Sequence, residues 1–155
     1  MYPSILGLHE LLRWVAVLLT LAAALRGLAG WARGGGWSSR DARLGLAATA
    51  ALDAQVTVGL LLSAWLSPVG LRALASVGWG GLEIAELRFW AVLHPLFMLG
   101  AVALAHVGRV RTRAESPPAT RHRLAAAHFG AAVLLVAFAA PWPGLTGWPP
   151  LALWP

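Results

Sequence analysis

The chain has 155 residues and no cysteine; 59% of its residues are hydrophobic and 12% are charged. A soluble domain carries about 25% charged residues, so this composition predicts one integral membrane domain over residues 1–155, without disulfides or thiolate metal sites. The formal net charge is +6, but the basic residues are all arginines in short segments beside apolar runs, so contact with the lipid bilayer is expected and nucleic-acid binding is not.

Four apolar segments are each about long enough to cross the ~30 Å hydrocarbon core of a bilayer as helices. They are predicted over residues 5–31, 44–66, 87–108 and 124–140. The connections are a Gly/Ser-rich loop, a segment 67–86 holding a short interfacial helix and a turn, and an Arg/Pro/Ser-rich loop over 109–123. The tail, residues 141–155, carries five prolines and is expected to lie along the membrane surface rather than form a fifth helix.

The arginines predict the orientation of these segments. Nine of them fall on one side of the predicted membrane: Arg26, Arg33, Arg40, Arg43, Arg109, Arg111, Arg113, Arg121 and Arg123. Only Arg13, Arg72 and Arg88 fall on the other side. By the positive-inside rule the first group is cytoplasmic, which places both termini outside. We therefore predict an all-α, antiparallel four-helix transmembrane bundle.

Two histidines are expected at similar depth in the outer half of the membrane. His9 lies near the outer boundary of the first helix, and His94 lies about 10 Å inside the outer end of the third. Two imidazoles from different helices are what a six-coordinate haem iron needs, and Arg13 and Arg88 are placed to pair with haem propionates. Alternatively, His9 is solvated and His94 hydrogen-bonds a backbone carbonyl, or Met98 joins both histidines in a copper site.

A second histidine pair is expected on the cytoplasmic side. His106 and His128 lie about one turn from the inner ends of the third and fourth helices, which makes a second haem or metal site geometrically feasible. The alternative is that each histidine caps carbonyls at its own helix end. His122 falls between two arginines of the predicted loop and is interpreted as a solvated residue.

Asp53 falls near the middle of the second helix, where an ionisable group is costly. Thr49, Asp53 and Thr57 form one stripe, and Gln55, Gly59 and Ser63 form another on roughly the opposite side. Asp53 is predicted either to relay protons or to hydrogen-bond a quinone or a haem ligand, and Gln55 is predicted to face the same quinone or haem ligand. The alternative for Asp53 is a neutral acid that bonds across helices.

Several segments resemble a family of small bacterial four-helix membrane proteins labelled cytochrome b or cytochrome b561-like. They are 8–14 (LHELLRW), 53–60 (DAQVTVGL), 88–94 (RFWAVLH), 107–109 (VGR) and 140–143 (APWP). The resemblance covers nearly the whole chain. It implies a multi-pass protein of the bacterial inner membrane with both termini periplasmic.

The resemblance also implies haem b held by His9 and His94. Two positions depart from the family pattern, which tends to have His in place of Asp53 and Glu in place of Leu93. We expect an electron-transfer protein of a quinol-linked respiratory chain rather than a stand-alone enzyme. The alternatives are a cofactor-free subunit that packs in a larger membrane complex or with copies of itself, and a small proton-coupled transporter.

Overall fold

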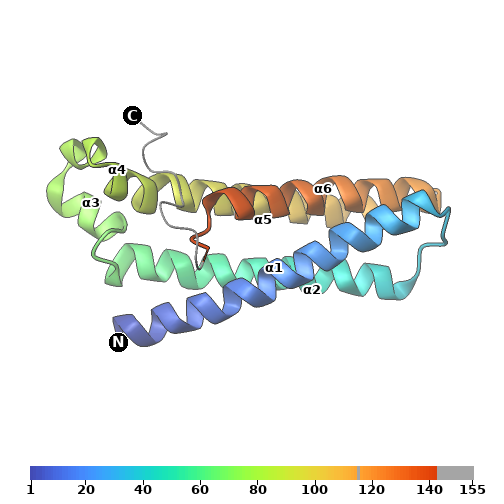
Figure 1. Ribbon diagram of the computed structural model, residues 1–155, viewed down its shortest axis with the longest axis horizontal. Helices are drawn as coiled ribbons and strands as arrows, with labels where there is room; N and C mark the ends of the chain where they lie inside the picture. Colours follow the sequence, from blue (N-terminus) through green and yellow to red (C-terminus); the bar gives the residue numbers. More distant parts are fainter. Residues whose placement is uncertain (115, 143–155) are drawn as a thin grey trace.

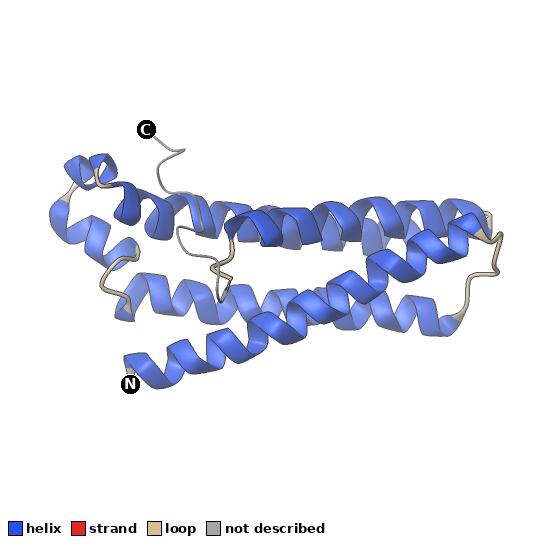
Figure 2. Ribbon diagram, viewed as in Figure 1, coloured by secondary structure: helices blue, strands red, loops and turns tan. Residues whose placement is uncertain are grey.

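The structure is a computed structural model that describes residues 1–114 and 116–142. Its helices are α1 (Tyr2–Ala32), α2 (Ser39–Leu61), α3 (Leu71–Val77), α4 (Ala85–Arg88), α5 (His94–Arg113) and α6 (Pro118–Ala139). The described part of the chain contains no strand (Figure 2). Four helical stretches are long and apolar enough to cross a membrane: Tyr2–Ala32, Ser39–Val77, Ala85–Arg113 and Pro118–Ala139. The prediction of an all-α protein with four such helices is confirmed.

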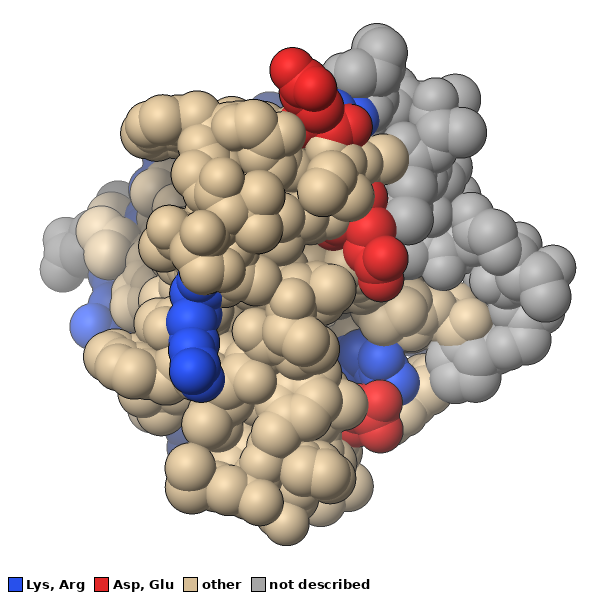
Figure 3. Space-filling model, turned by 90° about the vertical axis from the view of Figure 1, so that its left-hand side faces the viewer, with Lys and Arg blue, Asp and Glu red and all other residues tan. Residues whose placement is uncertain are grey.

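The four long helices lie side by side in an elongated bundle (Figure 1). α1 packs against α2 and α6, and α5 packs against the same two helices. The α1–α2 and α5–α6 connections lie at one end, called the loop end (residues 33–38, 114, 116 and 117). The N-terminus lies at the opposite end with α3 and α4, called the N-terminal end. Viewed from there, charged side chains form separate spots on a largely uncharged surface (Figure 3).

Buried residues, most of them small, recur at alternating three- and four-residue spacing on the inward faces of the helices. The buried positions with this spacing are Ala16, Thr20, Ala23, Gly27 and Gly30 on α1; Asp41, Gly45, Ala48, Leu52 and Gln55 on α2; Met98, Ala101, Ala105, Gly108 and Thr112 on α5; and His122, Ala125, Phe129, Ala132, Val136 and Ala139 on α6. This is the spacing of coiled-coil seams. Small side chains let backbones approach closely, which is how membrane helices gain packing energy without a hydrophobic driving force.

Large apolar side chains point the other way. Leu11, Leu18 and Leu25 follow one another at seven-residue spacing on the outside of α1, and Leu134 of α6 is 71% exposed. A soluble monomer rarely exposes so continuous an apolar surface. Large residues outside and small residues inside suit helices whose surroundings are lipid chains.

The prediction that residues 109–123 form a loop is wrong. α5 continues to Arg113, and α6 begins at Pro118, six residues before the predicted start of the fourth span. Arginine is a good helix former, and proline is well tolerated in the first helical turn because its missing N–H would have no intrahelical partner there. The connection is therefore only a few residues long. The tail beyond Trp142 lies outside the described residues.

Two π-helical turns interrupt the long helices near the N-terminal end. One, Leu62–Leu66, ends α2 before Pro68, and the other, Phe89–Leu93, joins α4 to α5. Pro95 has no N–H to donate to the carbonyl of the preceding turn, so the helix opens into a wider turn before it. The short helix predicted within 67–86 is present as α3, followed by Gly78 with φ of 79°.

Candidate cofactor site

A cavity of about 220 Å³ lies between the helices in the N-terminal half of the bundle. Its polar lining comprises His9, Glu10, Arg13, Gln55, Ser63, Ser67 and His94. Apolar residues, among them Leu52, Val56, Trp90, Met98 and Val136, supply most of the remaining lining. The cavity thus brings together the two histidines of the predicted haem site from α1 and α5. Both π-helical turns also contribute to its wall.

His94 is fixed by a bond to the neighbouring helix. Its Nδ1 lies 2.8 Å from the carbonyl oxygen of Ala139 on α6, and since a carbonyl only accepts, Nδ1 carries the proton. The ring also packs beside Trp90, with centroids 5.2 Å apart. This is the carbonyl bond that the alternative interpretation expected. It also leaves Nε2 with a free lone pair, which is how proteins orient a metal-binding imidazole.

His9 is held by Gln55 from α2. Its Nε2 lies 3.2 Å from the Gln55 amide nitrogen, while its Nδ1 and the Gln55 amide oxygen are both buried without a hydrogen-bond partner. In this placement Nε2 accepts from the amide N–H, so Nδ1 carries the proton. With the amide group turned over, its oxygen accepts from Nε2–H, and Nδ1 keeps a lone pair that can bind a metal ion. Gly59 lies so close that an added Cβ would be 2.8 Å from His9 Cε1. The predicted stripe of Gln55, Gly59 and Ser63 does face one common space.

The two arginines predicted near the haem have different positions. Arg13 lines the cavity, donates from Nη1 to the carbonyl oxygen of Pro141 at 3.1 Å, and keeps a buried Nε without a partner. Arg88 is not among the residues that line the cavity. Its Nη1 donates instead to the carbonyl oxygen of Leu82 at 2.8 Å. Arg13 is therefore the better placed of the two to meet an anionic group in the cavity.

Asp53 faces away from the cavity. Its Oδ1 lies 2.9 Å from His106 Nε2, and the two side chains are 44% and 49% exposed on the outer surface of the bundle. The pair joins α2 to α5, as the alternative of an acid bonded across helices expected. Gln55 is thus the only one of the two predicted polar groups of α2 that reaches the cavity.

The two histidines of the second predicted site bond to different groups. His128 Nδ1 donates to the carbonyl oxygen of Leu124 in its own helix at 2.8 Å, and its Cβ would lie 2.6 Å from a Cβ added at Gly108. His106 bonds to Asp53 instead. Leu124 lies inside α6, so this bond within the helix is not the capping of a helix end that the alternative expected.

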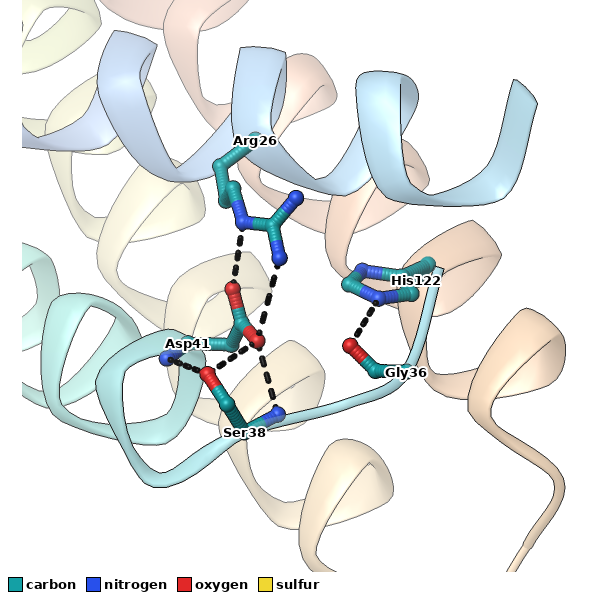
Figure 4. A network of polar contacts seen from close by, with 5 residues as sticks. All are labelled: Arg26, Gly36, Ser38, Asp41 and His122. Carbon is teal, nitrogen blue, oxygen red and sulfur yellow. Dashed lines mark hydrogen bonds and ion pairs between the residues drawn. The ribbon is translucent and has the colours of Figure 1, made fainter. Parts of the chain in front are cut away.

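The interpretation of His122 as a solvated residue is wrong. It is 0% exposed, because α6 already includes it and turns it inward against Trp37, with ring centroids 4.9 Å apart. Its Nε2 donates to the carbonyl oxygen of Gly36 at 3.3 Å (Figure 4). The seam of α6 contained the signal, because position 122 continues the spacing of Ala125 and Phe129.

Within the described ranges, no group of three or more His, Cys, Asp or Glu side chains could hold a metal ion. A haem iron needs only two protein ligands, and Met98 also lines the cavity, as a copper site would require. Comparison with protein-family models, with curated proteins and with solved structures finds no match to this chain.

Proposed function

We propose that the chain is a multi-pass protein of the bacterial inner membrane, an antiparallel bundle with both termini periplasmic. The support is the concentration of arginines at the loop end, which the positive-inside rule assigns to the cytoplasm. The absence of native cysteine makes single-cysteine labelling a clean test. A membrane-impermeant maleimide should label Gly80→Cys in intact spheroplasts and Gly36→Cys only after lysis. The reverse pattern would invert the topology.

We propose further that the cavity binds haem b through His9 and His94. The observation that carries this proposal is that two imidazoles on different helices line one largely apolar cavity, one with its second nitrogen already fixed and the other with a buried nitrogen unpaired. The donor set suits a six-coordinate haem iron. The resemblance of segments 8–14 and 88–94 to small cytochrome b-like proteins supports the same assignment.

Residues of the chain would hold and orient the haem. His94 is oriented by Ala139, Gln55 orients His9, and Arg13 offers a guanidinium to a propionate. When bound, haem b supplies a one-electron iron couple, and we propose that the protein passes electrons from a membrane quinol to a periplasmic acceptor. The cavity, about 220 Å³, is smaller than the ~300–1,000 Å³ of ordinary ligand pockets, so a haem would extend beyond it or the helices around it would move apart on binding.

The proposed haem site is tested by measuring the haem content per chain in purified variants. His94→Ala and His9→Ala should each abolish stoichiometric haem, whereas His128→Ala, outside the cavity, should retain it. His94→Met separates ligation from folding, because a thioether keeps the iron low-spin and raises its potential. Normal haem in both cavity variants would refute the site. Copper instead of iron in the wild-type protein would support the Met98 interpretation.

A second candidate function is a cofactor-free subunit of a larger membrane assembly, formed with other chains or with copies of itself. The observation that favours it is the Asp53–His106 pair, which is half-exposed on the outer face where lipid would otherwise surround it. A partner helix would shield this pair. In that case Asp53→Leu should dissociate the detergent-extracted assembly while His94→Ala leaves its mass unchanged. A wild-type protein of single-chain mass would rule this function out.

A further inference from the structure

A second cavity, of about 390 Å³, lies toward the loop end of the bundle and is lined by arginines from all four long helices. They are Arg26 on α1, Arg43 on α2, Arg109 and Arg113 on α5, and Arg121 on α6. Apolar residues, including Ala125 and Phe129, complete the wall. None of the residues of the predicted haem site lines this second cavity.

Most of this positive charge is not neutralised within the described residues. Asp41 is the only carboxylate in the lining, and it already bonds Arg26, with Oδ1 2.6 Å from the Arg26 Nε. The same carboxylate accepts from the backbone N–H and the hydroxyl of Ser38, which fixes it at the start of α2 (Figure 4). The remaining four arginines have no described carboxylate partner, and the Nε of Arg121 is buried without a hydrogen-bond partner.

We propose that this cavity binds a phosphate-bearing anion. Guanidinium groups match phosphate oxygens with paired N–H donors, and four uncommitted groups around one space leave several charges to be neutralised. The site lies where a bundle of apolar helices ends, the level at which a phospholipid headgroup meets a membrane protein, and basic pockets between helices bind such headgroups. The phosphate of an anionic lipid and free phosphate share this chemistry.

The test measures lipid binding to the delipidated full chain in detergent by native mass spectrometry. Phosphatidylglycerol should bind more tightly than phosphatidylcholine. Arg109→Gln with Arg113→Gln should weaken the binding of phosphatidylglycerol about 25-fold, or about fivefold for each arginine near the headgroup. The matched control, Arg111→Gln with Arg123→Gln, removes the same charge from exposed positions outside the lining and should change it less than about twofold.

A parallel titration with inorganic phosphate, scored by the melting temperature at constant ionic strength, separates the two sources of the anion. Protection by phosphate without a lipid preference would assign the site to free phosphate, and the lipid preference would assign it to a headgroup. Equal weakening of phosphatidylglycerol binding in the two double variants would overturn the proposal. A wild-type protein that shows neither a preference for phosphatidylglycerol nor protection by phosphate would also overturn it. If the cavity pair does not fold, Arg43→Gln, which is exposed, should still weaken binding about fivefold.

Discussion

A close backbone contact between α1 and α6 predicts the effect of a single methyl group. Gly27 of α1 faces α6, and a Cβ added there would lie 2.6 Å from the backbone nitrogen of Ala126 and 3.0 Å from the carbonyl oxygen of His122. The shortest ordinary Cβ contact is 3.4 Å, so α1 and α6 would have to separate by about 0.8 Å. Because the contacted atoms are backbone, no side chain can rotate away. Overpacking of this kind costs about 1–3 kcal/mol.

Gly130→Ala is the matched control. It places the same methyl group on a helix with no atom within 4 Å, so it should only gain about 1 kcal/mol of helix propensity. Since Gly27→Ala gains the same propensity, it should be less stable than Gly130→Ala by about 1–3 kcal/mol. Thermal unfolding in one detergent, followed by the intrinsic fluorescence of the nine tryptophans, ranks the variants. A Gly27→Ala melting temperature equal to or above that of Gly130→Ala would refute the packing argument.

Three further outcomes are expected. Ser38→Ala removes the N-cap of α2 and should cost about 1 kcal/mol, measured by the same melts, while an unchanged melt would contradict the capping box. A double-mutant cycle on Asp53 and His106 should give a coupling of about 0.6 kcal/mol, the average for membrane hydrogen bonds; zero coupling would contradict the pair. Gly59→Ala should displace the His9 ring by about 0.6 Å and lower haem content without lowering the melting temperature of the haem-free protein; unchanged haem would place the ligand elsewhere.

The residues that share one face of a single helix could be predicted from the sequence. The stripe of Gln55, Gly59 and Ser63 lines one cavity because residues at i, i+4 and i+8 share a helix face. The same reasoning could have predicted that His122 is buried. Its position extends the seam of α6, and only the assumption that arginines end a helix removed it from that seam.

Pairing between helices could not be predicted in the same way. Depth counted from an assumed helix end placed His106 one turn from that end, but α5 runs on to Arg113, so His106 lies about 10 Å from the observed helix end. The structure brings Gly45 and Thr112 to one cavity, so that Asp53 and His106, some two turns further along their helices, meet. Relative level and rotation depend on packing, which no single segment encodes.

The most direct test of the proposed haem site is a reduced-minus-oxidised visible spectrum of the purified protein, expressed with ample haem, together with a pyridine haemochrome count. Ligation by His9 and His94 in the cavity predicts a sharp low-spin b-type band at one haem per chain. A colourless protein that unfolds cooperatively would contradict it and direct attention to the outward Asp53–His106 face.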